Sequence, residues 1–544
     1  MRSLLITIAG CPRTPSDFIP DNGLALLASI ILDAGHQVKI LDYNTTETLR
    51  RLFPEKFQHK LKKIAQKIFL QSGKPGPFTI VELSLLEKRL SAYQQKVFYE
   101  IGSEIADLVE KERIDLVGLK LWNGDGFTAS LAIANVLKKR HPRLAVFAGG
   151  PHVDTFRENI YKVTSNFDGL AFGEGEETIL GLIDVVLGKK SLHRVPNLIF
   201  KEDGRVITTP QKRVTDLNSL PFANYDPDVY PAMNNNGRLN FLVIDESRGC
   251  NFQCYFCPHP VKSGRLRTKK ASRVVEEMAH YQRRYGTRLF RYGGSNTPPD
   301  LMEEVAREIL AKGLKVEYTG STDLRREDFD FPLLKRSGCF GLFFGVESAD
   351  AKILKEKMNK KASPELMREI LKKAKKEGVF SVVSFIFPAP GQTEENRQKN
   401  LEFLLQTTPN SMVVQFPGLF PETEWFKNSE LFGFEIYDKD TYAQKMMDYK
   451  IRLFFPPRFW DPLPYKVNGK DFRQFSKETE DFMWQVEKGL KIDVSVSDDL
   501  ALMAKYLHTS PKDFRDQARL DFFTGNAEGL QKMIETINLN SKIM

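Results

Sequence analysis

The segment Arg248-Gly-Cys-Asn-Phe-Gln-Cys-Tyr-Phe-Cys-Pro-His-Pro260 decides how the chain is interpreted, because it gathers three cysteines in one short loop. Cys250, Cys254 and Cys257 have the spacing CxxxCxxC. Three thiolates on such a loop can bind three irons of a cubane, whereas a closed electron-transfer cluster normally takes four cysteines. The spacing therefore predicts a 4Fe-4S cluster on Cys250, Cys254 and Cys257, with one iron left open to a small ligand.

Zinc is the main alternative for these cysteines. A structural zinc ion needs a fourth ligand to close its tetrahedron, and His259 is the nearest candidate. His259 follows Cys257 by only two positions, which is too near for an unstrained fourth corner, so we interpret it as a loop residue. Cys11 and Cys339 stand apart from the loop and are expected to be ordinary packed or loop thiols. A disulfide framework is not expected from this distribution.

Apolar runs alternate with helical patterns on both sides of the loop. Such alternation is typical of α/β folds with parallel strands. In residues 239–433 we expect six strands with intervening helices, which form a partial (β/α)6 barrel. The expected strands are 241–245, 289–292, 315–319, 341–346, 379–387 and 411–416.

The same alternation in residues 1–190 predicts a doubly wound, Rossmann-like domain, interrupted by a helical insertion at about 47–112. Residues 191–238 are rich in proline and other turn formers and are predicted to be a linker. Residues 434–544 are predicted to form a mainly helical C-terminal domain. At 544 residues the chain is long enough for three domains.

The amino-acid composition restricts the possible partners of the protein and its cellular location. The 79 Lys and Arg against 70 Asp and Glu give a net charge of +9, which solvated helix faces explain, so no nucleic acid partner is expected. No stretch of about 20 apolar residues occurs, and the apolar run at 3–9 is too short for a signal peptide. We therefore expect a cytoplasmic protein with no transmembrane segment.

The cysteine spacing, with aromatic Phe256 just before the third cysteine, resembles the signature of the radical S-adenosylmethionine (SAM) superfamily. Arg291-Tyr-Gly-Gly-Ser295, Gly345-Val-Glu-Ser348 and Phe387-Pro-Ala-Pro-Gly-Gln-Thr393 are similar to further segments of that family. An ordinary turn at the glycines and a salt-bridged strand end at the glutamate are the structural alternatives. The resemblance implies that SAM is bound by Phe256, Gly293, Gly294, Ser295 and Glu347.

The N-terminal part resembles the cobalamin-binding domain that precedes many radical enzymes. The resemblance lies in residues 21–28, 117–121, 147–152 and 172–176. It implies cobalamin contacts from Leu119, Gly149, Gly150, Gly173 and Glu174. No histidine follows an aspartate by two positions, so the DxHxxG loop is absent and the cobalt is expected to lack a protein histidine. His36 and His152 are interpreted as turn and loop residues, and a degenerate domain that binds nothing is the alternative.

Together the two resemblances imply a class B radical SAM methyltransferase. Such an enzyme makes a 5'-deoxyadenosyl radical, abstracts hydrogen from an unactivated carbon of a small-molecule, lipid or peptide substrate, and transfers a methyl group from methylcobalamin. A flavodoxin or ferredoxin is the expected electron donor. The alternatives are a radical SAM cyclase, ring-rearrangement or C-C coupling enzyme without net methyl transfer, and a cobalamin or iron-sulfur sensor. The sequence does not identify a catalytic acid or base.

Overall fold

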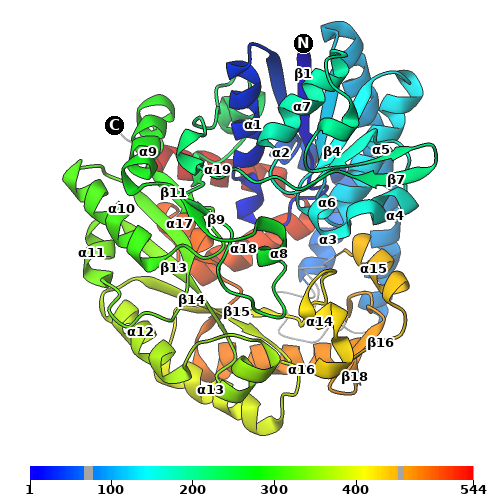
Figure 1. Ribbon diagram of the computed structural model, residues 1–544. Helices are drawn as coiled ribbons and strands as arrows, with labels where there is room; N and C mark the ends of the chain where they lie inside the picture. Colours follow the sequence, from blue (N-terminus) through cyan, green and yellow to red (C-terminus); the bar gives the residue numbers. More distant parts are fainter. Residues whose placement is uncertain (67–76, 451–458, 543–544) are drawn as a thin grey trace.

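Two β-sheets, one mainly and one entirely parallel, form the framework of the chain in a computed structural model that describes residues 1–66, 77–450 and 459–542 (Figure 1). The N-terminal sheet has the order β2-β1-β3-β4-β5-β6-β7, and its first five strands are parallel. These are β1 (Arg2–Thr7), β2 (Gln37–Asp42), β3 (Leu116–Lys120), β4 (Ala145–Gly149) and β5 (Gly169–Ala171). This parallel arrangement is the one expected of the doubly wound domain predicted for residues 1–190.

Helices cover both faces of this sheet, as the doubly wound prediction requires. Leu5 of β1 packs with α1 (Asn22–Asp33) and α7 (Glu176–Val186), whereas its neighbours Leu4 and Ile6 pack with the helices of the other face. Alternate residues of a strand point to opposite faces, so both sets are buried. The other face carries α5 (Asp125–Arg140) and the predicted insertion, whose described helices are α2 (Thr46–Leu52), α3 (Glu55–Ala65) and α4 (Pro77–Glu112). Residues 67–76 of the insertion lie outside the described residues.

Residues 191–238 contain more structure than the predicted linker. β6 (Leu198–Glu202) and β7 (Arg205–Thr208) form an antiparallel hairpin that extends the N-terminal sheet beyond β5. The turn is Asp203-Gly204, and both residues have positive φ, at 47° and 75°. An Asp-Gly pair is a strong hairpin signal, but here the flanking run is short and surrounded by prolines.

The second sheet has the order β19-β15-β14-β13-β12-β11-β8 with every strand parallel. Its six predicted strands are β8 (Phe241–Ile244), β11 (Leu289–Tyr292), β12 (Glu317–Thr322), β13 (Cys339–Glu347), β14 (Phe380–Ile386) and β15 (Ser411–Gln415). The seventh, β19 (Asp493–Val494), comes from the C-terminal segment and was not predicted. It lies at the edge beside β15.

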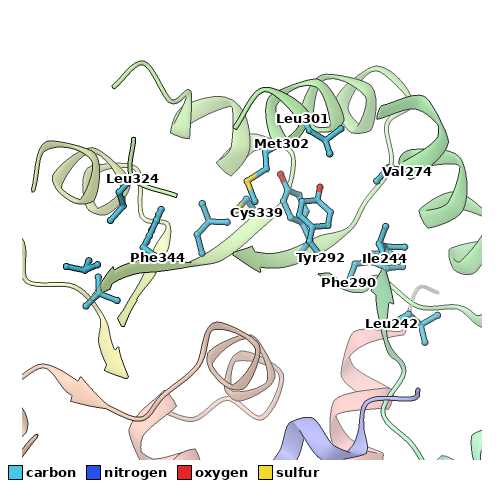
Figure 2. Close-up of a cluster of buried hydrophobic side chains, with 14 of the residues drawn as sticks. Leu242, Ile244, Val274, Phe290, Tyr292, Leu301, Met302, Leu324, Cys339 and Phe344 are labelled. Atoms are coloured by element: carbon cyan, nitrogen blue, oxygen red, sulfur yellow. The ribbon is translucent and has the colours of Figure 1, made fainter. Parts of the chain in front are cut away.

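Helices cover the outer face of this partial barrel. They are α9 (Ala271–Tyr285), α10 (Pro299–Ala311), α11 (Phe331–Arg336), α12 (Pro364–Lys376) and α13 (Glu394–Thr407). Figure 2 shows part of the layer between strands and helices, where Ile244, Phe290 and Tyr292 lie near Met302 and Leu301. Cys339 is buried in the same layer, which confirms that it is a packed thiol.

The C-terminal segment contacts both the barrel sheet and the helices that cover the N-terminal sheet. α17 (Asp498–Tyr506) packs on the opposite face of the barrel sheet, against β12, β13 and β14. α18 (Pro511–Thr524) contacts α3, and α19 (Ala527–Ser541) contacts α2. Before them come α14 (Glu424–Lys427), β16 (Phe434–Ile436), α15 (Lys439–Met447), β17 (Tyr465–Val467), β18 (Lys470–Asp471) and α16 (Phe472–Trp484). In the described ranges, no helix combines the length and apolar character needed to cross a bilayer.

Candidate active site

The carboxyl ends of strands from both sheets meet at one cavity of about 370 Å³. From the N-terminal sheet it is lined by the last residues of β3 and by the residues that follow β4 and β5, and from the barrel by those that follow β8 and β11. In Figure 1 the short elements β9 and α8 lie near the centre, between the two sheets. Seven predicted site residues line this one cavity: Leu119, Gly149, Gly150, Gly173, Glu174, Gly293 and Ser295.

Apolar side chains line part of this cavity. Leu24, Leu27, Ile179 and Leu182 line it from α1 and α7, and Phe147 lines it from β4. Its wall near the strand ends is close-packed: a Cβ on Gly150, where φ is +95°, would lie 2.8 Å from Cγ of Lys120. Apolar walls and glycine backbone at the strand ends fit the flat rings of a cobalamin.

The cysteine loop lies between β9 (Ser247–Arg248) and α8 (His259–Ser263) and is held by backbone hydrogen bonds. The N–H of Cys250 donates to the carbonyl of Gly264 at 3.0 Å, and the N–H of Cys257 donates to that of Cys254 at 3.1 Å. Gly249 has φ +82°, and a Cβ there would lie 2.3 Å from the carbonyl oxygen of Arg265, so the turn into the loop requires glycine.

The three thiols are close to one another and half-buried. Burial, together with the charges of Cys254 and Cys250, raises the pKa of Cys257 to about 12. Such thiols are expected to ionise when they bind metal. Within the described residues, no three Cys, His, Asp or Glu side chains converge on one ion. A cubane does not need that, because each thiolate binds a different iron, so the donor set fits a cluster.

Glu246, at the end of β8, organises the glycine motif and was not predicted. Its fully buried carboxylate accepts hydrogen bonds from the N–H groups of Gly293 (2.9 Å) and Gly294 (3.2 Å). It also accepts from the hydroxyls of Thr297 (2.6 Å) and Ser247 (2.8 Å). Gly294 does not line the cavity. Its position requires a glycine because a Cβ there would lie 2.2 Å from Oε1 of Glu246.

Glu347 ends β13 with a positive φ of 66° and is buried. Its carboxylate is 3.4 Å from Nζ of Lys360 and accepts a hydrogen bond from Ser384 at 3.0 Å. Glu347 does not line the cavity, but it lies near the cysteine loop. Burial is the largest cause that raises the pKa of Cys254, and the charge of Glu347 also raises it. Phe256 also lies outside the lining, and its ring packs 5.5 Å from that of Trp425.

The positions of two histidines agree with the interpretation that neither binds cobalt. His152 is not the loop residue that was predicted, because it lies in α6 (Pro151–Phe156). It is fully buried between the rings of Phe127 and Phe156, and its Nδ1 is 2.7 Å from Oδ1 of Asn123. Burial lowers its pKa to about 3, so it stays neutral. His36 lies in the turn between α1 and β2. Neither lines the cavity, whereas His259 does, from the barrel side.

Comparison with known proteins identifies both parts of the chain. A family model described as the radical SAM superfamily matches residues 246–404, and one described as the B12 binding domain matches residues 85–183. The chain is a radical SAM protein with a B12-binding domain. The predicted family is thereby confirmed. The radical SAM domain implies a 4Fe-4S cluster and SAM, and the B12-binding domain implies cobalamin.

Among curated relatives, an uncharacterized methyltransferase of Pyrococcus horikoshii is 29% identical over 55% of this chain and 66% of its own length. The chain therefore spans about two thirds of that relative. An anaerobic magnesium-protoporphyrin IX monomethyl ester cyclase of Synechocystis is 23% identical over 74% of this chain and 71% of its own. The cytidylyl-2-hydroxyethylphosphonate methyltransferase of Streptomyces wedmorensis is 22% identical over 81% of this chain and 82% of its own.

One solved structure has a similar fold along the whole chain. It is that of the radical SAM methyltransferase TsrM from Kitasatospora setae with cobalamin and a 4Fe-4S cluster bound. It covers 98% of this chain and 99% of its own at a TM-score of 0.64 and 14% identity. At this identity the likeness concerns the fold alone, and it confirms the predicted fold class.

Proposed function

We propose that this chain is a cobalamin-dependent radical SAM methyltransferase that methylates an unactivated carbon of a small-molecule, lipid or peptide substrate. The observation that carries the proposal is the shared cavity. Gly149, Gly150 and Gly173 line it from the B12-binding side, and Gly293 and Ser295 line it from the radical SAM side. A methyl carrier and a radical source that open to one chamber can act on the same substrate carbon.

The residues of the chain have separate roles in this proposal. When bound, the cluster supplies an electron for the reductive cleavage of SAM, and cobalamin supplies a carrier for the methyl group. Cys250, Cys254 and Cys257 hold the cluster. Glu246 fixes the backbone of the glycine motif, and the carboxylate of Glu347 is available to a polar group of SAM once Lys360, at 3.4 Å, shifts.

The B12 site is assigned to the N-terminal wall of the cavity. Leu119, Gly149, Gly150, Gly173 and Glu174 line it, and none of the described N-terminal residues in the lining is a histidine. This agrees with the missing DxHxxG loop. We assign the electron supply to a flavodoxin or ferredoxin, and we place the protein in the cytoplasm because its three cluster thiols must stay reduced to bind iron.

Anaerobic reconstitution with iron, sulfide and cobalamin, followed by absorbance and electron paramagnetic resonance (EPR) spectra, tests both cofactor assignments. With the true substrate, the proposal predicts paired formation of 5'-deoxyadenosine, S-adenosylhomocysteine and a methylated product. Cys254→Ser should lose the cluster, while Cys11→Ser, which changes a thiol outside the loop, should keep it. Deoxyadenosine formed with the true substrate but without S-adenosylhomocysteine would contradict methyl transfer.

A cyclisation without net methyl transfer is the second candidate. The observation that favours it is the alignment of the Synechocystis cyclase over 74% of this chain, although the Streptomyces methyltransferase aligns over 81%. The mass of the product separates the two reactions, because methylation adds one methylene unit whereas oxidative cyclisation removes hydrogen.

A further inference from the structure

Four ion pairs join the two halves of the cavity, and all four have the same polarity. Each cation comes from the segment around the cysteine loop, and each anion comes from the loop or the first helical turns that follow an N-terminal strand. The pairs are Arg248 with Glu176 (2.7 Å) and with Glu174 (3.7 Å), Lys262 with Asp154 (2.9 Å), and Arg267 with Glu174 (2.6 Å). We call these six residues the interdomain clamp.

The clamp is well shielded from water. The carboxylates of Glu176, Asp154 and Glu174 are only 9%, 7% and 12% exposed. Arg267 binds Glu174 with two nitrogens, at 2.6 and 3.0 Å. Buried, bidentate pairs of this kind resist screening and hold a fixed geometry.

On the radical SAM side the clamp brackets the cluster. Arg248 precedes Cys250 by two residues, and Lys262 lies in α8, directly after the loop. Arg267 lies in β10 (Arg267–Thr268), where it is paired in register with Arg248 of the antiparallel strand β9. A displacement of any of the three cations therefore moves a segment that is covalently continuous with the cluster ligands.

On the B12 side the clamp holds the predicted corrin-binding loops. Glu174 directly follows Gly173, and its carboxylate also accepts the N–H of Val214 at 2.6 Å. Asp154 uses its second oxygen to accept the N–H of Gly173 at 2.6 Å. The carboxylate of Glu174 is thus already used by the barrel side, so its side chain acts through Arg267 rather than on cobalamin.

We propose that the interdomain clamp positions the cluster loop against the B12 site and couples the two, so that each cofactor binds more tightly when the other is present. Arg248, Lys262 and Arg267 are positioning residues in this scheme. The inference rests on the cofactor sites of the proposed function, but not on the identity of the reaction. Because coupling between two sites is reciprocal, it can be measured from either cofactor.

The test is the affinity of the full chain for hydroxocobalamin, measured by anaerobic equilibrium dialysis with and without the reconstituted cluster. We expect the cluster to tighten cobalamin binding about tenfold in the wild type, a typical coupling between sites. In Arg267→Met and in the isosteric Glu174→Gln the effect should fall to about twofold or less, with the cluster still formed. Arg265→Met, which removes an exposed arginine of the same segment that is outside the clamp, should keep the wild-type coupling.

The coupling between the two cofactor sites can also be measured at the cluster. The EPR spectrum of the reduced cluster should change on addition of cobalamin in the wild type and in Arg265→Met, but not in Glu174→Gln. Equal cobalamin affinity with and without the cluster in the wild type would overturn the clamp, as would coupling that survives in both clamp variants. Failure of cobalamin to bind either form would contradict the proposed function itself and this inference with it.

Discussion

Gly294→Ala is the substitution that most directly tests how the glycine motif is held. A Cβ on Gly294 would lie 2.1 Å from Oγ of Ser247 and 2.2 Å from Oε1 of Glu246. Non-bonded carbon and oxygen atoms do not approach so closely, and both partners are buried. The carboxylate of Glu246 must therefore move, and it cannot move without changing its hydrogen bonds to Gly293, Gly294 and Thr297.

Two costs add in this variant. Overpacking a tight site costs about 1–3 kcal/mol. Loss of one hydrogen bond to a charged, buried acceptor costs about 1.5–3 kcal/mol more. We expect the free energy of unfolding to fall by about 2.5–6 kcal/mol. Gly489→Ala is the matched control, because a Cβ there would meet only Cγ of Gln485, at an ordinary 3.8 Å. The control should stay within about 1 kcal/mol of the wild type.

Urea unfolding of the full chain, followed by circular dichroism, measures this difference. The SAM affinity of the reconstituted protein should fall with it, because Gly293 and Ser295 line the cavity on either side of the substituted residue. A Gly294→Ala variant as stable as Gly489→Ala, with wild-type SAM affinity, would refute the argument that Glu246 sets the backbone of the motif.

Three further predictions concern the B12 site, the cluster and helix α17. Gly150→Ala, whose Cβ would lie 2.8 Å from Cγ of Lys120 at a φ of +95°, should weaken cobalamin binding at least about tenfold in dialysis, while the iron content is unchanged. Cys254→Ala should abolish cluster absorbance and deoxyadenosine formation, whereas a chain that acts only as a sensor would keep its partner binding. Burial, together with the charge of Asp499, raises the pKa of Asp498 from 3.8 to about 7, so the folded chain binds the extra proton and stability falls as pH rises through this range. Between pH 5 and pH 8 this group should cost about 2–3 kcal/mol, and Asp498→Asn should remove that part of the pH dependence in urea unfolding.

The elements that could be predicted from the sequence are those with a strong local pattern. β1 and β13 are long apolar runs bounded by turn residues, and the cysteine loop is specified by spacing alone. β19 has two residues, Asp493 and Val494, and pairs with β15 about 80 positions earlier in the chain, so no local pattern reports it. A strand of that length owes its conformation to the edge on which it lies.

The site shows the same division between local and distant information. Gly149, Gly150 and Gly293 could be predicted because glycine after a strand has a backbone reason that a pattern reveals. The role of Glu246 could not be predicted, because a glutamate beside a strand is normally solvated. Its role depends on the N–H groups of Gly293 and Gly294, which are 47 and 48 positions away in the sequence. The signal available was the acidic pair Asp245-Glu246, which directly follows the apolar strand β8 and precedes the cysteine loop.

The polarity of the interdomain clamp also suits the chemistry of the loop that it brackets. Three thiolates bring more negative charge to an oxidised cubane than its iron-sulfur core offsets, and reduction adds a further electron. Arg248, Lys262 and Arg267 place their positive charges on the segment that carries this cluster, and their acidic partners lie on the opposite wall. With the charges exchanged, Glu or Asp beside Cys250 would disfavour the reduced cluster. The observed polarity of the ion pairs joins the two halves of the cavity and places the cations on the side of the cysteine loop.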